Sequence, residues 1–313
     1  MKICFVGAGA VGGFYGALLS RAGHDVSFIA RGAHRDAIEQ HGLRVIGPLG
    51  DFTVRTPAES DPARIGPVDL VVHTVKTYDN AVAIPLIRPL VGPSTAVLSL
   101  QNGVDSAEEI AAAVGERAVL GGSTYIATAI EGPGVIRQTG THRRVVLGEY
   151  FQPPPGISAR VREIADAMTA ADIHAEAVPD ARHTVWEKFT YLAPFAAFTG
   201  AARLPIGPLW SDDYIQQMFL DAVEEVADVA RAHGVKLPAD HRSRVFEYAI
   251  KLPPSTRSSL LIDLSQGKRI EVEALQGSVV RRAARVGVKT PIMAALYAVL
   301  KPHAGGTPST PPS

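Results

Sequence analysis

A glycine-rich run directly follows the first apolar stretch of this 313-residue chain. Residues 3–6 are apolar, residues 14–21 have a helical pattern, and between them lies the run Gly7-Ala8-Gly9-Ala10-Val11-Gly12. In such a unit the first glycine permits a tight turn, the second lets the backbone approach a phosphate, and the third lets the helix pack closely on the strand. The start of the helix then offers N–H groups to an anion. The run predicts a binding site for a dinucleotide pyrophosphate, with a purely structural turn as the alternative.

The residue after the second predicted strand indicates which dinucleotide is bound. Residues 25–30 read as this strand and Arg31 follows it, where an NAD site usually carries Asp or Glu. A guanidinium is planar, always charged and able to pair bidentately with a phosphate. Arg31 therefore favours NADP(H), whose ribose carries a 2′-phosphate. The alternative is a solvated loop arginine.

Two apolar strands end on polar side chains. Residues 68–75 are followed by Lys76, and residues 96–100 by Gln101 and Asn102. Ligands of open α/β sheets bind outside the carboxyl ends of the strands, so Lys76 and Asn102 are candidates to touch a cofactor or a substrate. A loop lysine and an Asn-Gly turn are the alternatives.

The second half of the chain adds further candidates. Lys188 stands near the start of an otherwise apolar helix, and a lysine in a desolvated cleft has a lowered pKa and becomes a usable proton donor. Its alternative is a side chain that reaches out to solvent. Ser259 lies in the first half of the segment 258–273, and Glu271 opens the next helix, where an acidic residue is also an ordinary feature of a helix N-terminus.

The order of these elements predicts an α/β fold. Strand and helix patterns alternate over residues 1–179, which indicates a Rossmann-like, doubly wound sheet. Residues 135–138 and 144–148 read as two late antiparallel strands. Residues 180–302 have helical periodicity and predict an all-helical second domain that carries substrate and catalytic groups. Residues 303–313 are rich in Pro, Gly and Ser and predict a disordered tail.

Composition narrows the choice of partners. The formal net charge is zero, which gives no reason to expect nucleic acid or an anionic membrane as partner. The single cysteine, Cys4, is compatible with a reducing cytoplasm, and no apolar run is long enough to span a bilayer. No metal-binding histidine spacing is present. We expect a cytoplasmic protein without a metal.

Taken together, these segments resemble the ketopantoate reductase (2-dehydropantoate 2-reductase) family over residues 2–301. The matching segments are Gly7–Gly12, Arg31, Val75-Lys76, Gln101-Asn102-Gly103, Trp186-Glu187-Lys188, Ser258-Ser259 with Asp263, and Ile270-Glu271-Val272-Glu273. The resemblance implies hydride transfer from NADPH to the ketone carbon of a 2-oxo acid, most simply ketopantoate in the pantothenate pathway that leads to coenzyme A.

The resemblance also implies roles for individual residues. Lys188 is the expected general acid, and Glu271 is expected to pair with it or to hold substrate hydroxyls and to adjoin the cofactor. Lys76 and Asn102 are expected at the cofactor ribose and the substrate, and Ser259 at the substrate carboxylate. Gly7, Ala8, Gly9, Ala10, Val11, Gly12 and Arg31 complete the expected cofactor site.

This chain departs from the family at two positions of the expected pocket. The family typically places asparagines one and two helical turns after the catalytic lysine, where this chain has Leu192 and Ala196. The loss of both amides predicts relaxed recognition or a more apolar 2-oxo acid, unless Thr190 and Thr199 compensate. A sensor that binds NADPH without catalysis is a further alternative. A homodimer is one option for the assembly, but the helical pattern shows no exposed apolar stripe that would identify a dimer surface.

Overall fold

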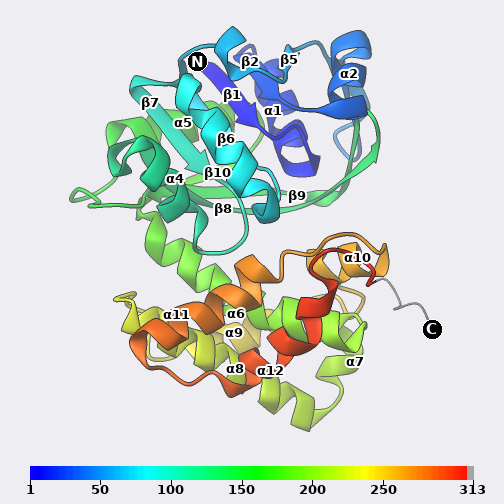
Figure 1. Cartoon of the computed structure of the whole chain (residues 1–313), viewed down its shortest axis with the longest axis vertical. Helices are drawn as coiled ribbons and strands as arrows, with labels where there is room; N and C mark the ends of the chain where they lie inside the picture. Colours follow the sequence, from blue (N-terminus) through cyan, green and yellow to red (C-terminus); the bar gives the residue numbers. More distant parts are fainter. Residues whose placement is uncertain (309–313) are drawn as a thin grey trace. The chain divides into compact units, whose positions relative to one another are not determined.

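The computed structural model describes residues 1–308, and its chain divides into two compact units (Figure 1). The first unit consists of Met1–Gln101 and Ser106–Thr184. The second consists of Asn102–Asp105 and the chain from Val185 onward. The chain therefore leaves the first unit for four residues, returns, and leaves it again after Thr184.

One mixed sheet forms the centre of the first unit. Its strands are β1 (Lys2–Val6), β2 (Asp25–Ile29), β3 (Leu43–Ile46), β4 (Phe52–Val54), β5 (Ala58–Glu59), β6 (Val68–His73), β7 (Val91–Ser99), β8 (Val119–Gly132), β9 (Val135–Glu149) and β10 (His174–Asp180). They are ordered β4-β3-β9-β8-β7-β6-β1-β2-β5, with β10 also paired to β9. All pairs from β8 to β5 along this order are parallel, whereas β3–β4 and β8–β9 are antiparallel.

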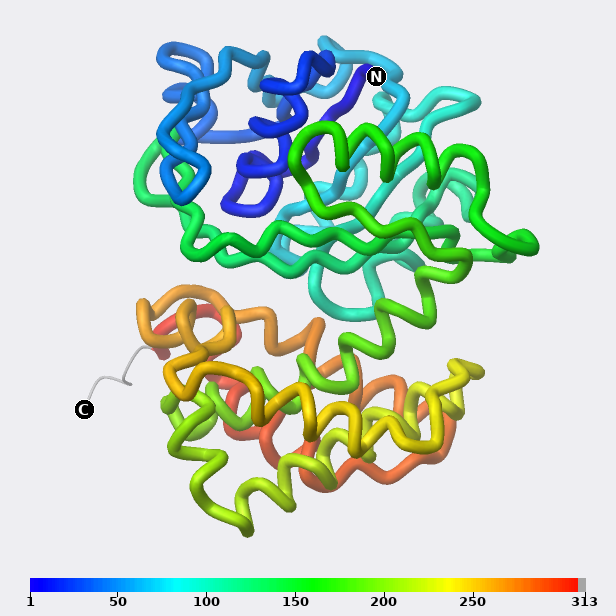
Figure 2. Tube along the Cα trace, turned by 180° about the vertical axis from the view of Figure 1, so that it is seen from behind, coloured from blue at the N-terminus to red at the C-terminus, as the bar shows by residue number. Residues whose placement is uncertain are grey.

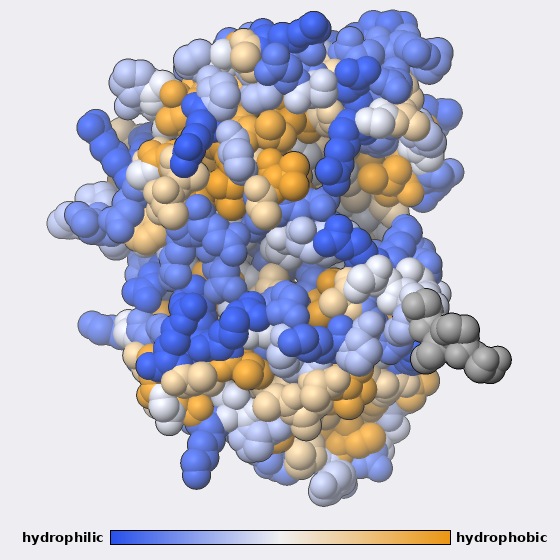
Figure 3. All heavy atoms as spheres, in the orientation of Figure 1, coloured by the Kyte–Doolittle hydropathy of each residue, from blue (hydrophilic) through white to orange (hydrophobic). Residues whose placement is uncertain are grey.

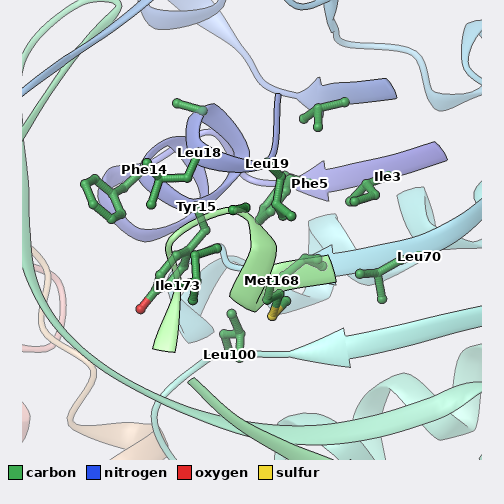
Figure 4. Packing of buried hydrophobic residues seen from close by; sticks show 14 of the residues in the cluster. Ile3, Phe5, Phe14, Tyr15, Leu18, Leu19, Leu70, Leu100, Met168 and Ile173 are labelled. Atoms are coloured by element: carbon green, nitrogen blue, oxygen red, sulfur yellow. The ribbon is translucent and has the colours of Figure 1, made fainter. Parts of the chain in front are cut away.

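Helices cover both faces of this sheet. They are α1 (Ala10–Arg21), α2 (Gly32–His41), η1 (Pro62–Arg64), η2 (Thr77–Asp79), α3 (Asn80–Ala83), η3 (Ile84–Leu90), α4 (Ser106–Val114), η4 (Glu116–Ala118) and α5 (Ala159–Ala170). Figure 2 shows α1 and α5 in front of the sheet on the same side. Figure 4 shows Leu18 and Leu19 of α1 gathered with Met168 of α5 and Phe5 of β1 in this core. A separate core joins the opposite face to η3 and α4.

The second unit is helical. It contains α6 (Ala181–Ala202, shared at its start with the first unit), α7 (Ile206–Trp210), α8 (Asp213–Ala232), α9 (His241–Ala249), α10 (Ser259–Ser265), a π-helical turn η5 (Glu273–Gly277), α11 (Ser278–Val286), α12 (Pro291–Leu300) and η6 (Lys301–His303). Its main core gathers Trp186, Phe189, Val226, Leu260 and Leu275. Figure 3 shows apolar residues gathered on the lower part of its surface, in the region that α7 and α12 occupy in Figure 1.

The structure confirms the predicted fold class, a Rossmann-like α/β sheet followed by a helical region. The prediction of two separate strands at 135–138 and 144–148 is wrong. Residues 135–149 form the single strand β9, because β8 pairs with it on both sides of a register shift around Gly140.

The predicted disordered tail is wrong for residues 303–307. Thr307 N–H donates to the carbonyl of Gly267, and Ile270 N–H donates to the carbonyl of Ala304. These backbone bonds are long-range contacts that a low content of apolar residues does not reveal. Residues 309–313 lie outside the described part of the chain. Within residues 1–308 no helix is both long and apolar enough to cross a membrane.

Candidate active site

The glycine-rich turn lies at the carboxyl end of β1 and has little space for side chains. Gly7 has a φ of +107°, and a Cβ on it would lie 2.9 Å from the backbone nitrogen of Val75. A Cβ on Gly12 would lie 2.1 Å from the carbonyl oxygen of Gly7 and 2.3 Å from Oγ1 of Thr74. The Thr74 hydroxyl donates to the same Gly7 oxygen at 2.8 Å. Both glycines are therefore required by the close approach of α1, β1 and the end of β6.

Gly9 differs from these two glycines because a Cβ on it would meet no atom within 4 Å. Its φ of −67° suits any residue, so neither crowding nor strain explains a glycine here. Gly9 is the N-cap of α1 and, lacking a side chain, makes no side-chain cap to the first N–H groups of the helix. Open space before N–H groups at a helix N-terminus fits a phosphate, so this turn fits the pyrophosphate of a nicotinamide dinucleotide.

His34 of α2 holds this turn, and the sequence did not reveal it. Its Nδ1 accepts from Gly134 N–H at 3.1 Å, so its Nε2–H donates to the Ala8 carbonyl at 2.8 Å. In a trans peptide the carbonyl of Ala8 and the N–H of Gly9 point in opposite directions, so His34 also fixes the direction of that N–H. Because the partners are 26 and 100 residues away, no local pattern could show this role.

We predict that His34→Ala weakens the binding of a nicotinamide dinucleotide by about 5-fold, the effect of one net hydrogen bond. The variant leaves the glycines in place but frees the Ala8–Gly9 peptide to rotate. Titration of cofactor fluorescence measures the dissociation constant, with His41→Ala at the exposed end of the same helix as control. Equal dissociation constants for wild type and His34→Ala would contradict the role.

Arg31 and Lys76 each lie beyond the carboxyl end of a strand that flanks β1. Arg31 follows β2 as the N-cap of α2, and Lys76 follows β6 as the N-cap of η2. The Arg31 guanidinium donates to Asp79 at 2.7 Å, with its side chain 74% exposed. Since β2, β1 and β6 are parallel neighbours, these groups share the edge of the sheet at which the glycine turn lies.

A buried polar network joins the ends of β6 and β7 just before these groups. Gln101 Nε2 donates to the Val75 carbonyl at 2.6 Å and to Asn80 Oδ1 at 2.7 Å. His73 Nε2 bonds to the same oxygen at 3.1 Å, and burial lowers the pKa of His73 to about 4. A neutral His73 therefore donates to Asn80, as expected for a hydrogen-bonded core histidine. The network fixes the backbone that leads into Lys76.

The second unit brings together three of the predicted residues. Lys188 lies on α6 and its Nζ donates to Oδ1 of Asn102 at 3.1 Å. The carboxylate of Glu271, which is 7% exposed, interacts with the same ammonium. Burial lowers the pKa of Lys188 to about 8, and the negative charge of Glu271 opposes that shift. The ammonium is thus poised to give up a proton near neutral pH.

Ser259 and its neighbour differ in exposure. Ser259 is the exposed first residue of α10, and its substrate role stays a prediction. Ser258 is buried as the N-cap of α10, accepting from Leu261 N–H at 3.0 Å and bonding to the Thr199 hydroxyl at 2.8 Å.

The two threonines that could replace the missing amides have other partners. Thr199 donates to the Phe195 carbonyl at 2.6 Å, besides its bond to Ser258. Thr190 donates to the Glu187 carbonyl at 2.7 Å and contacts His241 Nε2 at 2.7 Å. Ala196 is 1% exposed, and Leu192 packs against the core of the second unit. The stretch of α6 after Lys188 therefore keeps its apolar character.

Comparison with known protein families shows which family the chain belongs to. The family model described as ketopantoate reductase PanE/ApbA matches residues 3–152, and the model of its C-terminal part matches residues 180–304. The chain belongs to the ketopantoate reductase family. As a member it has the family's Rossmann-like N-terminal domain and is related to oxidoreductases.

Individual relatives match along almost the whole chain. A 2-dehydropantoate 2-reductase of Nostoc sp. is 31% identical over 303 residues, covering 96% of this chain and 94% of its own. The crystal structure of a PanE/ApbA family ketopantoate reductase from Ralstonia eutropha has a TM-score of 0.86 at 35% identity and covers 96% of this chain and 97% of its own. A ternary structure of D-mandelate dehydrogenase with NADH and anilino(oxo)acetate has the same TM-score at 22% identity, covering 96% and 97%, which shows a shared fold.

Proposed function

We propose that this protein reduces a 2-oxo acid to a 2-hydroxy acid with NADPH, and that 2-dehydropantoate is the first substrate to test. Its product would be pantoate, a precursor of pantothenate and coenzyme A. The observation that carries the proposal is the Lys188 ammonium, with a pKa lowered to about 8 and held by Asn102 and Glu271. The matched family and its 2-dehydropantoate 2-reductase relatives support the reaction class.

When bound, the reduced nicotinamide supplies the hydride that the ketone carbon accepts. The glycine turn of the first unit binds the pyrophosphate, and Lys76 lies at the same sheet edge to add positive charge. Lys188 donates its proton to the carbonyl oxygen, where negative charge develops. Asn102 Oδ1 and the Glu271 carboxylate orient the ammonium while it does so.

The pH dependence of the reaction tests this role of Lys188. Since the acid must be protonated, we expect kcat/KM to fall above a pKa of about 8. Glu271 favours the charged form of Lys188, so Glu271→Gln will lower that pKa and move the fall to lower pH. Glu273→Gln is the control because Glu273 is exposed and pairs with Arg281 and Tyr297. A shift to higher pH in Glu271→Gln would contradict the assignment.

The choice of NADPH over NADH rests on Arg31. Its partner Asp79 is the acceptor of an exposed ion pair, and such pairs are worth about 0–1 kcal/mol, so a 2′-phosphate can compete for the guanidinium. We predict that Arg31→Ala weakens NADPH binding by about 10- to 100-fold, as for a charge-assisted contact, and changes NADH binding little. Fluorescence titration with both cofactors measures this, with Arg64→Ala as a control on another exposed ion pair. An equal loss of affinity for NADPH and NADH would contradict a contact between Arg31 and the 2′-phosphate.

The nature of the substrate side chain is the second open choice. Leu192 and Ala196 are apolar, and the hydroxyls of Thr190 and Thr199 are bonded elsewhere, which favours a more apolar 2-oxo acid. A site without hydrogen-bonding groups for a polar substrate gains little from binding that substrate.

A panel of 2-oxo acids, followed by the loss of NADPH absorbance, tests the function directly. Fast turnover of 2-dehydropantoate supports a pantothenate-pathway reductase, and turnover of only apolar 2-oxo acids supports the alternative. Leu192→Asn should then raise kcat/KM for 2-dehydropantoate relative to the apolar acids. Binding of NADPH without turnover of any member would refute the reductase and leave a sensor.

A further inference from the structure

The segment Asn102–Asp105 belongs to the second unit, although the chain on both sides of it belongs to the first. It follows the buried end of β7 and precedes α4. The segment forms no helix or strand of its own. Side chains and backbone of the second unit must therefore hold this segment in place.

Two residues of α11 hold Asp105. Oδ1 of Asp105 accepts from Nε of Arg282 at 2.7 Å and from the hydroxyl of Ser278 at 3.0 Å. Ser278 and Arg282 are four residues apart and so lie on the same face of α11. Arg282 also donates to the Val104 carbonyl at 3.4 Å, and Val104 is buried in the core of this unit. One guanidinium thus binds both the side chain of Asp105 and the backbone before it.

Arg282 is itself fixed by its surroundings. It is 5% exposed, and its guanidinium lies over the ring of Trp186, 5.6 Å from the ring centre. On that same ring His233 stacks at 5.9 Å, and its Nε2 lies 3.3 Å from the Arg282 carbonyl. Trp186 is two residues before Lys188 on α6. The guanidinium that holds the Asn102–Asp105 segment therefore packs against α6, the helix that carries the proposed acid.

Gly103 lets the segment approach the backbone of the second unit closely. It has a φ of +100°, and a Cβ on it would lie 2.9 Å from the carbonyl oxygen of Ala274 in η5. The turn at Gly103 separates the anchored residues from Asn102. Asn102 then meets Lys188 at 3.1 Å.

We propose that Arg282 is a positioning residue for the reaction proposed above: by binding Asp105 and the Val104 carbonyl it holds Asn102 in its hydrogen bond with Lys188. The inference rests on the proposed function for its kinetic consequence only. It assigns a part in catalysis to an arginine that is 94 residues from Lys188 in the sequence (282 minus 188) and is linked to Lys188 through Asp105, Val104 and Asn102.

The test compares Arg282→Met with Arg281→Met, which removes an exposed ion pair on the same helix. We expect Arg282→Met to lower kcat by about 10- to 100-fold, the cost of misplacing a group at the reacting centre, with the dissociation constant for NADPH unchanged. The fall of kcat with pH should move to lower pH, because Lys188 loses an acceptor that favours its charged form. Arg282→Lys keeps the charge without the planar fork and should restore part of kcat.

A double mutant separates positioning from general stability. If Arg282 acts through Asn102, Arg282→Met will cause no further loss of kcat in an Asn102→Ala background. An equal loss in both backgrounds, or a lower melting temperature with unchanged kcat, would overturn the proposal. Asp105→Asn, which keeps the shape of the anchor without its charge, replaces Arg282→Met should that variant fail to fold.

Hydrogen exchange tests the anchor without turnover. In Arg282→Met the amides of residues 103–105 should exchange faster than in the wild type, whereas Arg281→Met should leave them unchanged. Unchanged exchange in Arg282→Met would overturn the proposal even in an active enzyme. A wild type that reduces no 2-oxo acid but shows this difference would instead refute the proposed function and leave the anchor standing.

Discussion

Replacing Lys188 with methionine will lower kcat for 2-oxo acid reduction by about 10²- to 10⁴-fold, the usual contribution of a general acid. The binding of NADPH should change little, because the residues that fit the pyrophosphate and the 2′-phosphate belong to the first unit and Lys188 to the second. Methionine is flexible, has a similar length and carries no charge, so it replaces the aliphatic part of the lysine without its ammonium.

The same substitution should make the protein more stable at neutral pH. The pKa of Lys188 is about 8 in the folded chain and is near its ordinary value of 10.5 when unfolded. A lowered lysine pKa costs stability below pH 8, and this cost disappears as the pH rises towards 10.5. Lys188→Met removes the cost, so its melting temperature should exceed that of the wild type at pH 7.

Steady-state kinetics, cofactor titration and thermal melting measure the three effects together, with Lys289→Met as a control at an exposed lysine. Wild-type kcat in Lys188→Met would exclude Lys188 as the acid. A joint loss of kcat and melting temperature would indicate a structural lysine instead.

Gly9→Ala will weaken cofactor binding by at least about 100-fold, which corresponds to about 2.7 kcal/mol. The new Cβ projects into open space with no atom of the chain within 4 Å, and the backbone of Gly9 suits alanine. Folding is therefore unaffected, whereas a phosphate that must approach this backbone meets the methyl group.

Two other glycines sharpen the test. Gly132→Ala also adds a methyl group with nothing within 4 Å and should change neither stability nor cofactor binding. Gly12→Ala places a Cβ 2.1 Å from the Gly7 carbonyl oxygen and should reduce both. Fluorescence titration and thermal melting distinguish the three variants. Normal cofactor affinity in Gly9→Ala would show that the pyrophosphate does not bind at this turn.

Local sequence predicted the parts of the site that depend on local structure. The glycine turn was evident because its spacing is tied to one strand and one helix. Lys76 and Asn102 were found because each follows an apolar strand, and Lys188 because it interrupts an apolar helix. Their catalytic and binding roles stay predictions.

The supporting residues were not predictable, for a physical reason. His34 and Arg282 act on backbone and side chains 26 to 178 residues away, so only the tertiary fold brings donor and acceptor together. Arg282 reads in the sequence as one of two adjacent arginines on a helix, yet Arg281 is exposed and Arg282 is buried. Neighbouring positions of a helix point in different directions, so one arginine faces solvent and the other faces the core. The sequence alone does not show which face of the helix is buried, so it does not mark Arg282 as the unusual one.

Because residues 102–105 belong to the second unit, the two units cannot be separated by a single cut in the chain. A gene fragment that begins at Val185 would encode the second unit without Asn102–Asp105, and it would include Lys188 and Glu271. It would lack Asp105, so the Arg282 guanidinium would remain buried without its carboxylate, which is costly. It would also lack the amide that accepts from Lys188. The helical second unit is thus not encoded by one continuous stretch of the gene. A recombination that exchanges this unit between relatives must also exchange residues 102–105.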